Sequence, residues 1–340
     1  MALPVLFLLA AITTLAAGAP AEASPETYQR DTYQYVVNTS DPAVHRAADL
    51  LNASRPIHAL EQLQDALLRH PHDPKVLLLA GLAAYRSDEI QAALDYWKMS
   101  LDLAPNQTLN RLYEDAQREA AADQNSRKLY GVHIALRYDT ETVDADSARA
   151  VLTTLDDAYS RISAQLGCSA DEPIAAIVRS RESYLSVTGA ADWSGGQYDG
   201  RIHIAALPGM TEGNLDASLQ RSLQHELVHA CLMSIPSGSS PWPAWLQEGL
   251  AQKLSGDTLQ PSVRQELRKR AAAHRIPRLQ DLGDDWSSMP KQKATDAYNL
   301  ALAAAEIIWD GMPPDAIRNV LADRDALPRL TALIEAKLGF

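Results

Sequence analysis

The hydrophobic positions of the chain follow a helical period over most of its length and a strand pattern in two short stretches. Asp146–Leu166 carries apolar residues three and four apart, as one face of a helix requires. Gly131–Tyr138 alternates apolar and polar side chains, and Ile174–Val178 is a short apolar run, so both stretches predict strands. The pattern predicts an α+β fold with a small sheet and a mostly helical C-terminal part.

Apolar residues at helical spacing continue toward the C-terminus. The stretch 277–290 lacks this period and predicts a loop, whereas the charged segment 262–274 predicts an exposed helix. The remaining predicted helices are 182–187 (a short helix or turn), 211–233 (a helix with its lead-in), 294–311, 314–321 and 327–338.

An internal repeat precedes these elements. Ala59 and Ala93 are 34 residues apart, as are Pro71 and Pro105, and 34 residues is the tetratricopeptide (TPR) period. We therefore predict TPR-like helical repeats over residues 44–125. Fewer than three full repeats rarely fold alone, so we expect this block to pack on the following domain. There it serves either as a groove for a protein partner or extended substrate, or as a structural support.

The N-terminus predicts a signal peptide. The apolar run of residues 4–17 is too short to span a bilayer comfortably, and Ala21-Glu22-Ala23 offers an A-x-A cleavage site. We assign residues 1–23 to the signal and 24–43 to a linker, which implies a periplasmic or secreted protein with no membrane span after cleavage. An uncleaved anchor or a buried helix is the alternative.

Charge and cysteine content limit the possible partners. The chain has 31 Lys and Arg against 43 Asp and Glu, a net charge of −12, which argues against nucleic acid because its binding needs a basic face. Cys168 and Cys231 are the only cysteines. In an exported protein they permit one disulfide, with two buried free thiols as the alternative.

The segment His225-Glu226-Leu227-Val228-His229 carries the candidate chemistry. On a helix, residues four apart share one face and are separated by a rise of about 6 Å. Both imidazoles can therefore reach one zinc ion at roughly 2.0–2.1 Å. Glu226 flanks the same face, where its carboxylate can accept a proton from a zinc-activated water.

A third ligand should lie nearby in space. Between Ala230 and Gln260 there is no histidine, and the only acids are Glu248 and Asp257. Glu248 falls in a segment that begins with Pro243 and reads as a new helix after a Ser- and Gly-rich loop. Two histidines and one glutamate leave a fourth zinc position open, as catalysis requires.

The HELVH segment followed by Trp-Leu-Gln-Glu-Gly-Leu-Ala resembles the gluzincin metallopeptidases, the thermolysin-like and peptidase MA-like group. The resemblance implies a thermolysin-like zincin catalytic domain over residues 128–340. It implies His225, His229 and Glu248 as Zn²⁺ ligands and Glu226 as general base. A metzincin site does not fit, because its glycine and third histidine would fall on Leu232 and Ile235.

The same resemblance suggests a substrate-binding strand. In thermolysin-like enzymes the free edge of the strand ahead of the zinc helix pairs with the substrate backbone, and here that strand would be 198–205. Tyr198, Gly200 and Ile202 are the predicted substrate-binding residues. An ordinary internal hairpin is the alternative. His203 is expected to be a cleft or surface residue and not a ligand.

Three further residues are candidates for supporting roles. Gln252, four residues after Glu248, stands where thermolysin has an aspartate that orients a zinc histidine, a role its amide oxygen would have to fill. Tyr298 opens a helix after the glutamate ligand, where peptidase MA-like sequences place a tyrosine, and its phenol could donate to the developing oxyanion. A core tyrosine is the alternative, with His274 as the reserve donor.

The sequence therefore predicts an exported zinc metallopeptidase that hydrolyses peptide or protein substrates. The Gly-x-Met-Glu-Asn segment that grips a substrate amine in aminopeptidases is absent, which favours an endopeptidase. A non-catalytic scaffold built from the repeats and the peptidase fold is the alternative function. A zinc hydrolase of other amides would use the same site chemistry.

Overall fold

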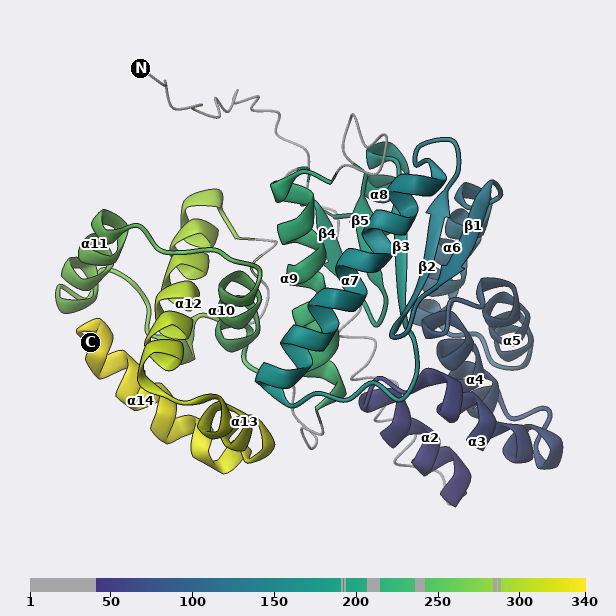
Figure 1. Ribbon diagram of the computed structural model, residues 1–340. Coiled ribbons are helices and arrows are strands. Elements are labelled where there is room, and N and C mark those ends of the chain that lie inside the picture. The colour runs from purple at the N-terminus through teal and green to yellow at the C-terminus, as the bar shows by residue number, and fades with distance from the viewer. Residues whose placement is uncertain are drawn as a thin grey trace.

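The computed structural model describes residues 41–190, 192, 194–206, 215–235, 242–283, 286 and 289–340. It is a mixed α+β structure in which helices surround one small sheet (Figure 1). The predicted signal peptide and all but the last residues of the predicted linker lie outside this described part. Within it, every helix is too short or too polar to cross a membrane.

A block of consecutive helices opens the described chain. Its members are α2 (Pro42–Asn52), α3 (Pro56–Arg69), α4 (Pro74–Arg86), α5 (Ile90–Leu103) and α6 (Gln107–Ala122). Proline at the first helical position favours the start of α2, α3 and α4. Helices α3 and α5 begin 34 residues apart and have the same length, which matches the predicted repeat period. The block begins at Pro42, two residues before the predicted boundary.

A buried tryptophan holds the middle of this helical block together. Trp97 on α5 is fully buried and donates from its indole nitrogen to the carbonyl of Leu78, 3.1 Å away. A Cβ atom at Gly81 of α4 would lie 2.2 Å from the indole ring, so only glycine permits this approach. The block therefore has a hydrophobic core of its own, separate from that of the rest of the protein.

The sheet has the strand order β1-β2-β3-β5-β4. Its strands are β1 (Ser126–Tyr130), β2 (Ile134–Asp139), β3 (Ile174–Arg179), β4 (Gly196–Tyr198) and β5 (Ile202–Ala205). Strands β2, β3 and β5 are parallel, and β1 and β4 pair antiparallel at the two edges. The strands predicted at 131–138 and 174–178 are confirmed as β2 and β3. Strand β1 was not predicted, because no clear apolar alternation marks it.

Helices α7 (Ala145–Leu166) and α9 (Ala217–Ser234) cover one face of the sheet (Figure 1). Alternate apolar side chains of β2, β3 and β5 join these helices in the main core, as the two-residue period of a strand allows. Cys168, just after α7, forms a disulfide with Cys231 on α9, with their Cα atoms 5.4 Å apart. This pairing settles the question that the sequence left open.

The C-terminal part is helical, as predicted. It contains α10 (Ala244–Leu254), α11 (Pro261–Ala272), α12 (Lys291–Gly311), α13 (Pro314–Ala322) and α14 (Leu327–Leu338). Helix α10 packs closely on α12 at Gly249. A Cβ atom there would lie 2.3 Å from the carbonyl oxygen of Ala301, so the absence of a side chain permits this approach. The predicted loop 277–290 contains one short 3-10 helix among its described residues, η1 (Leu279–Asp281). Helix α8 (Arg181–Thr188) follows β3, where a short helix or turn was predicted.

The helical block packs on the sheet through buried charges, which confirms the expectation that it does not stand alone. Three arginines on or beside the strands meet three acids of the block, and each of these six side chains is 7% exposed or less. The arginines are Arg137, Arg179 and Arg201, and the acids are Asp88, Glu119 and Asp123. Buried ion pairs of this kind fix a geometry, and loss of one partner costs about 3–5 kcal/mol.

Candidate metal centre

Helix α9 presents the two histidines of the HELVH segment on one face. Asp216 caps the helix by accepting from the backbone N–H of Leu219. Leu223 and Leu227 are fully buried and anchor the opposite face in the main core. The rings of His225 and His229 consequently lie side by side, with their centroids 5.0 Å apart.

Helix α10 supplies the third side chain of the cluster. Trp245, Leu246 and Leu250 are buried and hold the helix against the core. The side chain of Gln247 donates to the carbonyl of Trp242 and fixes the start of the helix. Glu248 is left on the surface that faces α9, with 22% of its side chain exposed.

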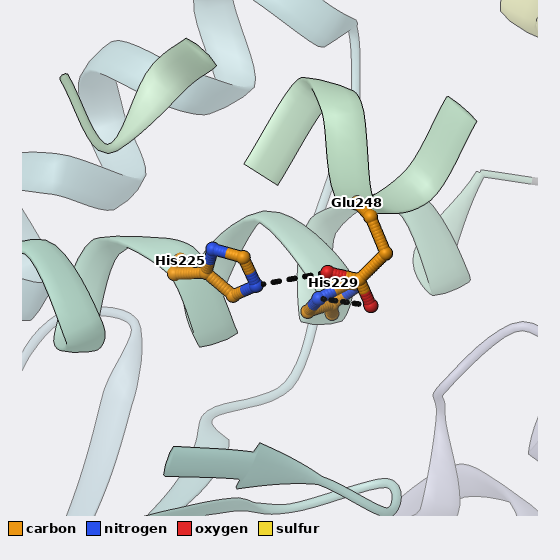
Figure 2. Close-up of side chains that lie close together, drawn as sticks. All are labelled: His225, His229 and Glu248. Carbon is orange, nitrogen blue, oxygen red and sulfur yellow. Dashed lines mark ion pairs between the residues drawn. The ribbon is translucent and has the colours of Figure 1, made fainter. Parts of the chain in front are cut away.

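The three side chains converge as predicted (Figure 2). Nε2 of His225 lies 3.2 Å from Oε2 of Glu248, and Nε2 of His229 lies 3.6 Å from Oε1. One ligand atom from each residue lies within 4.8 Å of the others. Among the described residues, this is the single group of three or more His, Cys, Asp or Glu side chains arranged in this way.

This arrangement fits a zinc ion. Neighbouring ligand atoms of a tetrahedral site with bonds of about 2.0–2.2 Å lie roughly 3.3–3.6 Å apart, close to the two distances observed. Oε2 of Glu248 is buried and has no hydrogen-bond partner of good geometry, which is costly for a carboxylate oxygen unless a cation satisfies it. Two imidazoles and one carboxylate are also the donor set of a catalytic zinc site.

The electrostatics of the cluster favour a positive charge between its members. Burial disfavours the charged form of His225, but the close contact with Glu248 and the other nearby carboxylates outweigh this effect and raise the pKa of His225 to about 9. Burial lowers the pKa of His229 to about 4, so this imidazole is neutral and able to ligate a metal. Burial opposes ionisation of Glu248, yet His229 and His225 hold its pKa below the usual value.

Glu226 lies beside the cluster and is not part of it. Only 7% of this residue is exposed, and burial raises the pKa of its carboxyl group to about 7, with His225 opposing the shift. A carboxylate with a pKa near neutrality is suited to take up and release a proton. The backbone of β4 approaches this side chain at Gly196, where a Cβ atom would lie 2.8 Å from Oε1 of Glu226.

Tyr298 on α12 faces the same site. Burial raises the pKa of its phenol above the usual value, and the carboxylates of Glu248 and Glu226 add to the shift. Its ring packs edge-on against Trp286, with the centroids 5.1 Å apart. The amide nitrogen of Gln252 donates to the backbone carbonyls of Glu248 and Tyr298 and so connects α10 with α12. The role of Gln252 in orienting a histidine stays a prediction.

The predicted substrate-binding strand needs correction. Residues 198–205 span a hairpin, and β5 lies between β3 and β4, so Ile202 is an internal strand residue with a fully buried side chain. Gly200 lies in the hairpin turn with a φ of 103° and packs against Arg86 of the helical block. The hydroxyl of Tyr198 lies 3.4 Å from that of Ser54, also in the block. The edge strand beside Glu226 is β4.

The two remaining histidines also differ from expectation. His203 is buried, with Nδ1 3.0 Å from Arg179 and Nε2 3.1 Å from Asp199, and is neither a cleft nor a surface residue. His274 is exposed just after α11 in a left-handed conformation, and its backbone N–H donates to the carbonyl of Ala271. The structure therefore gives His274 a role in ending a helix.

Sequence reasoning missed the residues that hold β4 beside Glu226. The hydroxyls of Tyr184 on α8 and Ser194 lie 2.8 Å apart, and that of Ser194 donates to the carbonyl of Gly196. Arg181 donates to the carbonyl of Ser194. The Gly195-Gly196 pair could be read from the sequence. That Gly196 allows β4 to approach Glu226 could not, because this contact depends on α9 packing against the strand.

No family model and no curated protein sequence matches the chain. The fold and the cluster therefore define it only as a mixed α+β protein with a His-His-Glu candidate metal site. What this site does has to be argued from the residues themselves.

Proposed function

We propose that the protein is an exported zinc metallopeptidase of the gluzincin type. The observation that carries the proposal is the convergence of His225, His229 and Glu248 from two helices, with Glu226 on the adjoining turn of α9. The buried carboxylate of Glu226 beside the cluster, whose pKa burial raises to about 7, supports a proton-transfer role.

The chemistry divides between the metal and the protein. A zinc ion bound by His225, His229 and Glu248 would lower the pKa of a water molecule and polarise a carbonyl group. Glu226 accepts the proton of the attacking water and delivers it to the leaving amine. Tyr298 would donate a hydrogen bond to the oxyanion that develops on the carbonyl.

The free edge of the sheet at β4 favours a peptide as the substrate. Within the described residues no strand pairs with the outer side of β4. Ala205 donates to the carbonyl of Gly195, and Asp199 donates to that of Arg201, so these odd-numbered positions of the hairpin pair inward. The backbone groups of the intervening Gly196 and Tyr198 consequently point outward. The carbonyl of Gly196 accepts from the hydroxyl of Ser194, and an extended peptide can pair with the remaining outward groups.

Zinc content tests the metal site. We expect about one zinc per chain in the wild type and none in Glu248→Ala after dialysis against a weak chelator. Asp257→Asn is the matched control, because Asp257 is the other acid that follows the HELVH segment and lies outside the cluster. Zinc bound equally well by Glu248→Ala would refute the site.

Cleavage of a broad peptide library tests the reaction. We expect Glu226→Gln to keep its zinc and to lose at least about 10²-fold in kcat/KM, because general-base catalysis contributes on the order of 10²–10⁴. Zinc binding by the wild type without any cleavage would favour the scaffold function. Turnover of simple amides but not of peptides would favour the other zinc hydrolases.

Export is supported by the disulfide between Cys168 and Cys231, because such bonds persist mainly in oxidising compartments. Mass determination of the mature protein is the direct check. We expect its N-terminus at Ser24, after the predicted cleavage site. A mature chain that keeps residues 1–23 would refute the signal peptide.

A further inference from the structure

The helical block contacts the turn between β4 and β5 through several side chains. Residues 198–201 of this turn meet three parts of the block: the connection between α2 and α3, the end of α4, and α6. The block therefore holds the hairpin that carries the edge strand. We call this set of contacts, made by Ser54, Tyr85, Arg86 and Glu119, the hairpin clamp.

Arg201 is the centre of the hairpin clamp. Its side chain is fully buried, and its two terminal nitrogens each lie 2.9 Å from a carboxylate oxygen of Glu119. The guanidinium carbon lies 3.7 Å from the centre of the Tyr85 ring, whose hydroxyl donates to Glu119. A bidentate, stacked arginine of this kind fixes both distance and orientation.

Two further contacts hold the residues on either side. Arg86 donates to the carbonyl of Leu51, and its side chain lies where a Cβ atom at Gly200 would be, 2.9 Å from Nε. Ser54 and Tyr198 bring their hydroxyls within 3.4 Å. The turn is thus held by a charge pair, a close backbone approach and a hydroxyl contact.

The clamped hairpin leads directly to the candidate active site. Tyr198 is the last residue of β4, and Gly196, two residues earlier, is the backbone neighbour of Glu226. We infer that the helical block is a positioning element of the proposed active site, which fixes the edge strand through the hairpin clamp. This inference rests on the proposed peptidase function, because the edge strand matters only if a peptide pairs with it.

The clamp favours the supporting role for the face of the block that contacts the hairpin. The side chains of Arg86 and Glu119 are buried against the hairpin and are therefore not available to a partner protein. This surface of the block supports the catalytic half. A rigid binding edge lowers the entropy cost of ordering a peptide, so the clamp is expected to act on KM and little on kcat.

The test compares Arg201→Lys with Arg137→Lys. Both changes remove a guanidinium from the same buried network, but Arg137 lies on β2 and outside the hairpin. Hydrogen exchange of the amides of residues 196–205 is measured by mass spectrometry, together with zinc content and the KM and kcat for a library peptide that the wild type cleaves. For Arg201→Lys we expect about tenfold faster exchange and a several-fold higher KM, with zinc content and kcat unchanged.

Arg137→Lys should lower overall stability without these local effects. Because Arg201→Lys risks unfolding, Ser54→Ala is the second variant, and a smaller change in the same direction is expected. The inference is overturned if the folded hairpin variants keep wild-type exchange and KM, or if Arg137→Lys changes both as much. If the wild type cleaves no peptide, the proposed function fails, while hairpin exchange still decides whether the clamp exists.

Discussion

Gly196 on β4 and Glu226 on α9 are in such close contact that the strand has no room for a side chain at this position. A Cβ atom on Gly196 would lie 2.7 Å from Cγ of Glu226 and 2.8 Å from its Oε1. The contact places the proposed general base directly against the edge at which a substrate backbone would pair. The position of the carboxylate therefore depends on a residue that contributes no functional group.

Gly196→Ala should displace the carboxylate of Glu226 and leave the zinc ligands in place. We expect full zinc content and a loss of about 10²-fold in kcat/KM, the order that a shift of 1 Å costs in a catalytic geometry. Gly195→Ala is the matched control, because its Cβ would meet only the side chain of Ser222, with the hydroxyl oxygen at 3.3 Å. Unchanged activity in Gly196→Ala would show that the contact does not position the base.

Gly249→Ala should weaken zinc binding through the packing of two helices. The new Cβ would meet the backbone of α12 at Ala301, so α10 has to shift and carry the neighbouring Glu248 with it. Overpacking of this kind costs about 1–3 kcal/mol of stability. The measurement is the zinc dissociation constant by competition with a chelator, and we expect it to rise at least about tenfold.

Gly81→Ala is the control for Gly249→Ala, because it overpacks a core that contains no zinc ligand. Its Cβ would meet the ring of Trp97 in the helical block, so it should lower the free energy of unfolding to a similar extent, about 1–3 kcal/mol. Its zinc affinity should remain that of the wild type. Equal loss of zinc affinity in both variants would mean that general destabilisation, and not the position of Glu248, is the cause.

The elements of the site were predictable because each is encoded locally. Helical periodicity predicted the C-terminal end of α9 to within one residue of its observed end at Ser234. The four-residue spacing of His225 and His229 predicted that both lie on one face of this helix. Glu248 could be predicted as the third ligand because only two acids, Glu248 and Asp257, lie between Ala230 and Gln260. Local pattern and the number of available ligands were sufficient, and the structure brings all three side chains together.

The arrangement around the site was not predictable, because it depends on contacts between distant segments. Tyr198–Ala205 was predicted as one strand with a hairpin as the alternative, and Gly200 in a left-handed conformation makes it the hairpin, with β4 at the edge of the sheet. The arginines of the sheet were a usable signal: Arg137 lies in a predicted strand and Arg179 directly follows one, and an arginine buried there requires acidic partners. Which acids those are, 14 to 60 residues away, only the fold decides.

Removal of the disulfide should destabilise the protein without emptying the metal site. The bond closes a loop of 63 residues, for which the chain-entropy relation gives about 4 kcal/mol. The double variant Cys168→Ala and Cys231→Ala avoids a stray thiol, and its free energy of unfolding in urea is the measurement. Zinc content of the folded double variant serves as the control. A stability equal to that of the wild type would contradict the prediction.

Acid should weaken the hairpin through Asp199. Burial opposes ionisation of this carboxyl, but His203 and Arg201 outweigh it and lower its pKa from 3.8 to about 2. Because the folded-state pKa is depressed, the ionised group stabilises the fold above about pH 4. That contribution, about 2 kcal/mol, is lost as the pH falls from about 4 to about 2. The free energy of unfolding measured in urea over this range is the test.

Asp199→Asn separates this group from the other acids of the protein. The amide cannot ionise, so the variant should be less stable than the wild type at pH 6 and should lose less of its stability between pH about 4 and about 2. Asp257→Asn, at a half-exposed acid, is expected to follow the wild-type curve. An Asp199→Asn curve parallel to that of the wild type would mean that the acid sensitivity of the hairpin arises elsewhere. The remaining candidates are then Glu119 and Asp88, whose pKa values their arginine partners also lower against the effect of burial.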